Sequence, residues 1–229
     1  MPVEFSLPGF DKDKTEFNIE LMENLGKTFP PGGARLSDGQ GSSFGGNDKT
    51  LIIICGVPLS GKTSIAKKVA EELGVKHLDV DTDIRFPIFG KPEQGADLTP
   101  EGKEQERVEM LASYKVMLSA TNELLTLGRS VILTATFSRE VYWELTNAVM
   151  AKHSDVKLRV IQCKIADDSD EEIWRRIRER GVHTVNSPAQ YREVKNRYIK
   201  LPVEHLEVDT TGPDNLVEKV SRIVKYVLG

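Results

Sequence analysis

The chain has 229 residues and carries 31 Lys and Arg against 35 Asp and Glu, which gives a formal net charge of −4 at pH 7. This mild acidity argues against sequence-independent binding of nucleic acids or membranes, and two cysteines are too few for a disulfide scaffold or a cysteine-rich zinc site. The chain start lacks a basic segment followed by an apolar run, and no apolar segment is long enough to cross a bilayer. We therefore expect a cytoplasmic protein without a membrane partner, large enough for one α/β domain and an extension.

Residues 1–49 differ in composition from the rest and predict a flexible N-terminal extension. Residues 16–25 can form one short helix with an apolar face, and the segment that follows is rich in proline, glycine and serine. Two interpretations stay open: a disordered tail with a docking helix, or an arm that binds a partner or covers a site. Residues 50–229 form the second predicted domain.

That domain begins with a predicted buried strand at residues 50–55 and a helix at residues 64–73. Between them, residues 56–63 match the phosphate-binding pattern G-x-x-x-x-G-K-[ST] at every constrained position. Backbone N–H groups of such a loop surround phosphates, and the start of the helix adds a partial positive charge. The predicted nucleotide-binding residues of this segment are Gly56, Val57, Pro58, Leu59, Ser60, Gly61, Lys62, Thr63 and Ser64.

Lys62 and Thr63 carry the chemistry of this loop. The Lys62 ammonium can reach the outer phosphates of a nucleotide, and the Thr63 hydroxyl can ligate Mg²⁺. A lysine in the first turn of a helix opposes the helix dipole, so its presence favours an anionic ligand. The alternative is a glycine-rich turn that joins strand and helix without a ligand.

Strands and helices alternate along the remaining sequence. Apolar runs predict strands at residues 75–80, 130–135, 157–165 and 205–209, and helical periodicity predicts helices at about 99–128 and at 140–152, 171–180, 188–198 and 215–228. This alternation builds a mainly parallel sheet with ligands outside the carboxyl ends of its strands. The sequence therefore predicts a three-layer α/β fold of the P-loop NTPase type with a mainly parallel five-stranded sheet.

An acidic segment follows the second predicted strand. Asp79, Asp81 and Asp83 alternate, so an extended strand would point all three carboxylates the same way. A carboxylate beside a phosphate loop can accept a proton from an attacking hydroxyl or hold Mg²⁺. Arg85 can pin an anionic or polyhydroxyl acceptor. The structural alternative is a solvated acidic turn with Arg85 as its local counter-ion.

The helix predicted at residues 171–180 begins with acids and ends with bases, which suits the helix dipole. Arg176 and Arg180 are four residues apart and share a face. With the loop at residues 181–188 they predict a helical lid that brings guanidinium groups onto a transferring phosphoryl group. The alternative is an exposed helix whose arginines are balanced by nearby glutamates.

At this point the chain resembles the small P-loop kinases related to zeta-toxin kinases, the 5′-hydroxyl kinase domain of polynucleotide kinases, and antibiotic and sugar phosphotransferases. The resemblance spans about residues 50–229 and rests on residues 56–63, 81–85, 128–139, 174–180 and 208–213.

The resemblance implies roles for the acidic segment and the loop. It implies that Lys62 and Thr63 bind phosphates and Mg²⁺, and that Asp83 is the base that activates the acceptor hydroxyl. Asp81 is the second choice for the base and is expected on the metal and the acceptor, while Arg85 is expected to hold the acceptor.

The resemblance also implies that the lid arginines, Arg176 and Arg180, grip the donor phosphates. The loop after the last strand is expected to flank the adenine through Thr211, Gly212 and Pro213.

Two positions depart from the family pattern. Relatives often carry an aspartate at the end of the third strand, where this chain has Thr134, so Asp81 or Asp79 is expected to take the metal role. Relatives commonly have glycine where this chain has Leu59, a residue that disfavours positive φ unless the position does not need it.

Together these features predict an ATP- and Mg²⁺-dependent kinase that moves the γ-phosphoryl group to a hydroxyl of a small molecule or of a nucleic-acid end. The net acidity does not favour the nucleic-acid end. Two alternatives stay open. One is a nucleotide-dependent switch or hydrolase, and the other is a non-catalytic ATP-binding module, which the threonine at position 134 favours.

Overall fold

The computed structural model describes residues 49–91, 99–180, 185–211 and 216–229. The predicted N-terminal extension lies outside the described residues except for Lys49, and so do Gly212, Pro213 and residues 181–184 of the predicted lid loop. The boundary between the extension and the second domain therefore stays a prediction.

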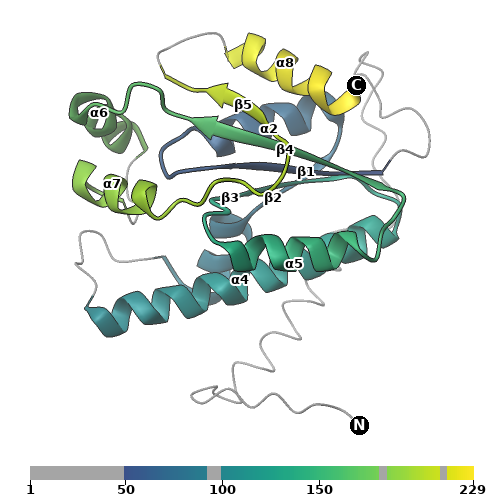
Figure 1. Cartoon of the computed structure of the whole chain (residues 1–229), viewed down its shortest axis with the longest axis horizontal. Helices are drawn as coiled ribbons and strands as arrows, with labels where there is room; N and C mark the ends of the chain where they lie inside the picture. Colours follow the sequence, from purple (N-terminus) through teal and green to yellow (C-terminus); the bar gives the residue numbers. More distant parts are fainter. Residues whose placement is uncertain (1–48, 92–98, 181–184, 212–215) are drawn as a thin grey trace. The chain divides into compact units, whose positions relative to one another are not determined.

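Five parallel strands form one sheet within the described ranges (Figure 1). The strands are β1 (Lys49–Gly56), β2 (Lys76–Asp79), β3 (Val131–Ala135), β4 (Val156–Lys164) and β5 (Leu206–Asp209). Their order across the sheet is β2-β3-β1-β4-β5, and every neighbouring pair is parallel. The predicted five-stranded sheet is confirmed, and the carboxyl ends of all its strands meet at one edge.

Helices cover both faces of the sheet. They are α2 (Lys62–Leu73), the π-helical turn η1 (Val80–Arg85), α3 (Phe86–Phe89), α4 (Pro100–Thr126), α5 (Glu140–Met150), α6 (Asp170–Arg180), α7 (Pro188–Asn196) and α8 (Leu216–Leu228). Figure 1 shows α2 and α8 on one face and α4 and α5 on the other, which confirms the three predicted layers. The pair α6 and α7 lies beyond the carboxyl end of β4. Of the helices described, none is both long and apolar enough to cross a membrane.

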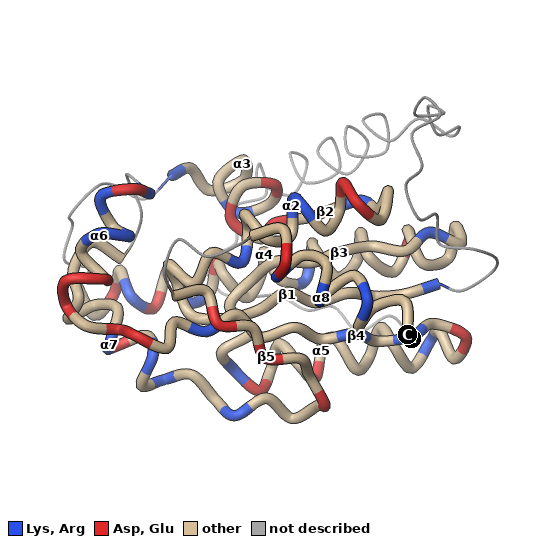
Figure 2. Tube along the Cα trace, turned by 90° about the horizontal axis from the view of Figure 1, so that it is seen from above, with Lys and Arg blue, Asp and Glu red and all other residues tan. Residues whose placement is uncertain are grey.

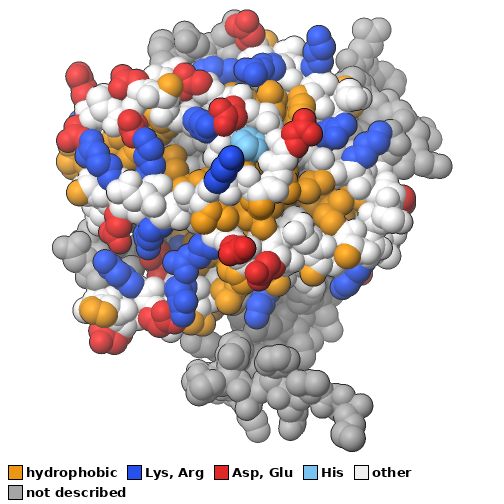
Figure 3. Space-filling view, viewed as in Figure 1, with side chains coloured by type: hydrophobic (Ala, Val, Ile, Leu, Met, Phe, Trp, Pro, Cys, Tyr) orange, Lys and Arg blue, Asp and Glu red, His pale blue; other side chains and the backbone are white. Residues whose placement is uncertain are grey.

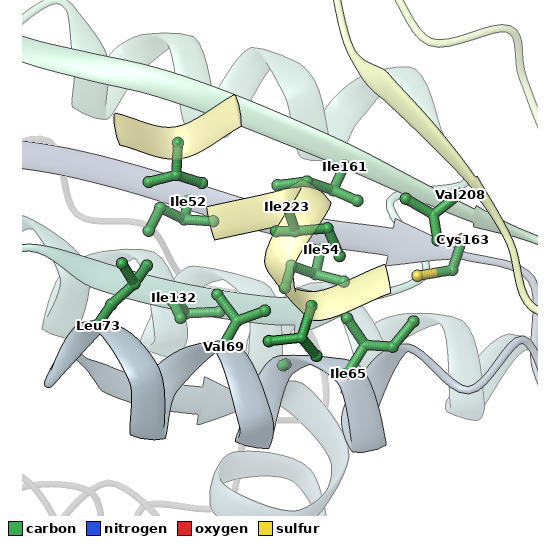
Figure 4. Packing of buried hydrophobic residues seen from close by; sticks show 13 residues of the cluster. Ile52, Ile54, Ile65, Val69, Leu73, Ile132, Ile161, Cys163, Val208 and Ile223 are labelled. Carbon is green, nitrogen blue, oxygen red and sulfur yellow. The ribbon is translucent and has the colours of Figure 1, made fainter. Parts of the chain in front are cut away.

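The central strand and the helix after it are fixed by apolar packing. Residues 51–55 of β1 have no exposed surface, as expected for a parallel strand with helices on both faces. Ile54 packs with Ile65 and Val69 of α2 and with Ile223 of α8 (Figure 4). Because each fully buried aliphatic side chain contributes about 1.5–3 kcal/mol, α2 and the end of the loop before it are held firmly.

On the opposite face, aromatic side chains hold the carboxyl end of β3. The ring of Tyr114 in α4 stacks on Tyr142 in α5 with centroids 3.7 Å apart. The backbone N–H of Phe137 donates to Tyr114 Oη at 2.8 Å, and Trp143 Nε1 donates to the Phe137 carbonyl at 3.1 Å. These bonds keep Phe137 at a φ of 52°, a left-handed conformation that needs support from its surroundings.

Charges of both signs intermingle on the face shown in Figure 3, where they border a band of hydrophobic side chains. This arrangement agrees with the small net charge of −4. Among the described residues on this face, no continuous basic surface of the kind that binds a nucleic-acid backbone is present.

The end of β2 differs from the prediction. The strand stops at Asp79, and the chain turns at once into η1. The Asp79 carboxylate causes the turn, because its Oδ1 accepts the backbone N–H groups of Asp81 and Thr82, each at 3.0 Å. Asp83 accepts the backbone N–H of Asp79 at 2.8 Å. The expectation that an extended strand points these three aspartates the same way is therefore wrong.

Candidate active site

The loop between β1 and α2 has the backbone conformation that its glycines permit. A Cβ atom at Gly56 would lie 2.3 Å from the carbonyl oxygen of Cys163 in β4, so only glycine fits there. Gly61 has a φ of 70° and caps the N-terminus of α2. The loop thus begins in close contact with β4, and it places the start of α2 at the carboxyl edge of the sheet.

Lys62 is the first residue of α2, and its side chain is only 8% exposed. Its Nζ donates to the Val57 carbonyl at 3.4 Å. Burial lowers the pKa of Lys62, as does the charge of Arg180, while Asp81 and Asp79 raise it. Two cations and two carboxylates therefore act on one another around the loop.

Thr63 contacts a carboxylate from the second strand. Its Oγ1 donates to Asp79 Oδ2 at 3.0 Å, and Thr134 Oγ1 donates to the same oxygen at 2.9 Å. His77 Nε2 lies 2.6 Å from Thr134 Oγ1. Because the single hydroxyl hydrogen of Thr134 is donated to Asp79, the hydrogen bond between His77 and Thr134 must use a hydrogen on His77 Nε2. A chain of hydrogen bonds thus runs from His77 through Thr134 and Asp79 to the loop.

Arg85 is buried among three partly exposed carboxylates. Its side chain is 7% exposed, and its Nη2 donates to Glu106 Oε1 at 3.2 Å. Glu109 lies 4.0 Å from the same nitrogen, and Asp81 Oδ1 lies 3.8 Å from Nη1. The guanidinium therefore joins η1 to α4 and holds Asp81 in place.

Asp83 is exposed, and its carboxylate accepts the backbone N–H of Asp79. The carboxylates that raise the pKa of Lys62 and Arg180 are Asp81 and Asp79. Asp83 acts instead on His77, whose pKa is lowered by burial and raised by the charges of Asp79 and Asp83. Of the two candidates for the base, Asp81 is therefore the one whose charge acts on the cations of the loop.

The helix α6 begins with acidic residues and has basic residues in its last turn (Figure 2). It contacts the phosphate loop through Arg176. Arg176 Nη1 donates to the Leu59 carbonyl at 3.0 Å and to Thr210 Oγ1 at 3.3 Å. Its Nη2 donates to the Thr210 carbonyl, and its Nε donates to Glu172 Oε1 at 2.6 Å. The structure thus places Arg176 against the backbone of the loop.

Arg180 lies one turn further along α6. The residue is exposed at the surface. Partial desolvation of its guanidinium lowers its pKa, while the charges of Asp81 and Asp79 raise it. Its charge also lowers the pKa of Lys62. The two predicted lid arginines are therefore in different environments, and only Arg180 acts electrostatically on Lys62.

The predicted adenine-flanking loop is described only as far as Thr211. Its Oγ1 accepts the backbone N–H of Ala166 at 2.8 Å and donates to Asp209 Oδ1 at 2.7 Å. These bonds join the carboxyl ends of β4 and β5 beside α6.

Sequence reasoning treated Asp79 only as an alternative metal ligand, and it missed Glu106, Glu109 and Thr210. The threonine at position 134 was a usable signal for Asp79, because a magnesium site without a carboxylate on the third strand needs one from another strand. The spacing of Glu106 and Glu109 on one helix face was a weaker signal, since such pairs are common on exposed helices. Nothing local in the sequence points to Thr210, whose contact with Arg176 joins segments far apart in the chain.

Comparison with known proteins agrees with this geometry. The chain is 32% identical to a shikimate kinase of Salinispora tropica over 110 residues, which cover 48% of this chain and 59% of the relative. The chain thus spans less than two thirds of that enzyme.

Two solved structures share the fold. A candidate kinase of Chloroflexus aurantiacus is 23% identical with a TM-score of 0.60, over 78% of this chain and 98% of that chain. A sugar kinase of Janibacter is 19% identical with a TM-score of 0.54, over 78% and 94% of the two chains. Residues 51–200, which include the phosphate loop, match the family AAA_33, described as an AAA domain. With a P-loop at its central strand and this match over more than half of its length, the chain belongs to the AAA_33 family.

Proposed function

We propose that this chain is an ATP-dependent kinase that transfers the γ-phosphoryl group to a hydroxyl of a small molecule. The observation that carries the proposal is the arrangement at the phosphate loop, where Lys62 is buried at the start of α2 and the Thr63 hydroxyl donates to the Asp79 carboxylate at 3.0 Å. Phosphoryl transfer requires mainly positioning and charge neutralisation, which Lys62 and Arg180, whose charge acts on Lys62, supply beside a phosphate loop. The likeness to shikimate kinase supports an alcohol as the acceptor.

The residues fit a magnesium ion. Mg²⁺ is usually held by one or two carboxylates, a hydroxyl and substrate phosphates, and Thr63 and Asp79 bring a hydroxyl and a carboxylate within 3.0 Å of each other. Among the described residues no group of three or more His, Cys, Asp or Glu forms a metal site of its own. Bound Mg²⁺ would neutralise charge on the phosphates, and Asp79 takes the metal-side role first expected of Asp81.

The chemical step needs a base for the acceptor hydroxyl. We assign this role to Asp81, because Asp83 already accepts a backbone N–H and lies exposed. The acceptor oxygen forms a bond to the γ-phosphorus, the bond between that phosphorus and the bridging oxygen breaks, and the hydroxyl proton passes to Asp81. Arg85, which is also paired with α4, orients Asp81, and Lys62 and Arg180 balance the charge of the phosphoryl group.

ATP consumption with and without a pool of hydroxyl-bearing metabolites tests the proposal. We expect strong stimulation by the pool in the wild type and none in Lys62→Ala. ATP hydrolysis that the pool leaves unchanged would favour a hydrolase or switch. Binding of Mg·ATP with no turnover under any acceptor would favour a non-catalytic module.

A further inference from the structure

The phosphate loop contains one residue whose side chain disfavours the backbone conformation that it adopts. Leu59 has a φ of 67°, a left-handed conformation that is strained for an L-residue with a side chain. Its side chain is 5% exposed and packs in a cluster with Ile165, Ile173, Val185 and Tyr191, which belong to α6, α7 and their flanking segments. A strained conformation persists only where the surroundings impose it, so α6, α7 and the segments beside them shape the phosphate loop.

The second restraint on Leu59 comes from Arg176. The Arg176 side chain is 10% exposed, and each of its three nitrogens donates to a protein oxygen. The bond to the Leu59 carbonyl fixes the plane of the peptide between Leu59 and Ser60, because a peptide unit is planar. The bonds to Thr210 fix the same guanidinium to the end of β5, and Thr210 is itself held by Lys164 O at 2.9 Å through its hydroxyl.

We propose that Arg176 is a positioning residue for the phosphate loop and does not grip the donor phosphates. The guanidinium holds the loop in its binding conformation by joining Leu59 to the carboxyl end of β5. Since Arg180 lies one turn further along the same helix, docking of Arg176 also fixes the part of α6 that carries Arg180. In this chain the helix α6 therefore holds a loop geometry that the Leu59 side chain disfavours.

The two roles predict different nucleotide affinities. A residue that grips only the γ-phosphoryl group affects ATP and the chemical step but leaves ADP binding unchanged, and one that grips the α- or β-phosphate weakens both nucleotides without changing the nucleotide-free loop. A residue that shapes the loop affects ADP and ATP alike, because the loop surrounds the phosphates that both share. It also affects the loop of the protein without nucleotide, which a direct phosphate contact does not.

The test compares Arg176→Ala with Arg175→Ala in the full chain. Arg175 is the matched control, because it is the neighbouring arginine, is 42% exposed and bonds only to Glu172 and Glu179 within the described residues. The dissociation constants of Mg·ADP and Mg·ATP are measured by calorimetry, and amide hydrogen exchange of residues 57–62 is followed without nucleotide.

We expect Arg176→Ala to raise both dissociation constants by the same factor of about 10–100, because a lost hydrogen bond from a charged group weakens the loop conformation that binds both nucleotides by about that factor. Faster exchange of the loop amides is expected to accompany this loss, and Arg175→Ala should change neither quantity more than about twofold, as is usual for exposed ion pairs. Unchanged exchange of the loop amides together with a loss of ATP affinity or kcat would overturn the proposal, whether or not ADP affinity falls as well.

Arg176→Lys covers the case in which the alanine variant does not fold. Lysine keeps the stem and the charge but lacks the planar set of donors, so it cannot hold Leu59 and Thr210 together. We expect an intermediate loss of ADP affinity, and wild-type ADP affinity would overturn the proposal. The inference rests on the proposed function only in its nucleotide readout. If the wild type binds no nucleotide, the proposed function fails, while hydrogen exchange of the loop still tests the role of Arg176.

Discussion

Asp79→Asn tests the metal side of the site most directly. The Asp79 carboxylate accepts four hydrogen bonds, two from backbone N–H groups at Oδ1 and two from the hydroxyls of Thr63 and Thr134 at Oδ2. Asparagine offers one oxygen and one NH₂ group in the same space. If the asparagine oxygen accepts from the backbone amides, its NH₂ group faces the hydroxyls of Thr63 and Thr134, which both donate hydrogen bonds to the carboxylate in the wild type.

The expected losses follow from these contacts. Hydrogen bonds to a charged group contribute about 1.5–3 kcal/mol each and neutral ones about 0.5–1.5 kcal/mol, so the two hydroxyl bonds lose about 2 kcal/mol of unfolding free energy together. The side chain also loses the negative charge that suits a magnesium ion beside Thr63. Substitution of such a supporting carboxylate typically costs about 10–100-fold in metal affinity or activity.

The assay titrates Mg²⁺ at saturating ATP and measures phosphoryl transfer, with urea unfolding of the same samples. We expect the half-saturating Mg²⁺ concentration to rise by about 10–100-fold. Asp83→Asn is the matched control on the same turn, because the asparagine oxygen can still accept the backbone N–H that Asp83 accepts. A wild-type Mg²⁺ response together with wild-type stability in Asp79→Asn would refute the assignment of the metal side to this carboxylate.

Three further changes test the rest of the site. Lys62→Ala is expected to stay folded by circular dichroism and to show no phosphoryl transfer, and transfer near the wild-type rate would contradict its role. Asp81→Asn is expected to lower kcat by about 10²–10⁴-fold with little change in ATP affinity, as for a lost general base, while Asp83→Asn keeps most of the turnover; the reverse result would restore Asp83 as the base. Bonds from Arg175 and Arg176 lower the pKa of Glu172 from 4.5 to about 2, so this carboxylate stabilises the fold above pH 4.5 and loses that effect as the pH falls toward 2. The difference in unfolding free energy between wild type and Glu172→Gln should therefore shrink across that pH range, and a constant difference would speak against the ion pair.

The fold could be predicted because its signals are local and repeated. The apolar run of residues 51–55, the glycine loop and the amphipathic face of α2 lie next to one another in the sequence, and each predicts the same strand–loop–helix unit. Alternation of further strands and helices then leaves few topologies, since parallel strands need crossover connections. The parallel pairing of all neighbouring strands agrees with that expectation, while the order of the strands was not predicted.

The site was less predictable because its decisive contacts join distant segments. Asp79 and Thr134 are 55 residues apart, and Arg176 and Leu59 are 117 apart. The spacing of Arg176 and Arg180 correctly indicates a shared helix face, yet it does not show that one guanidinium meets backbone oxygens. The end of β2 was missed for a different reason. The Asp79 side chain competes for backbone N–H groups and ends the strand, while strand propensity alone would continue it.

The threonine at position 134 is better understood from the sheet than from the motif. In the pairing of β2 with β3, Asp79 stands directly opposite Thr134, so the two side chains leave neighbouring strands at the same level. Neighbouring strands are about 4.8 Å apart, which a carboxylate and a hydroxyl bridge with one hydrogen bond. Under the proposed function the second strand supplies the metal-side carboxylate through Asp79, and Thr134 and His77 hold it toward the loop. A threonine at position 134 thus leaves a carboxylate beside the loop, so it does not by itself favour a chain that binds ATP without catalysis.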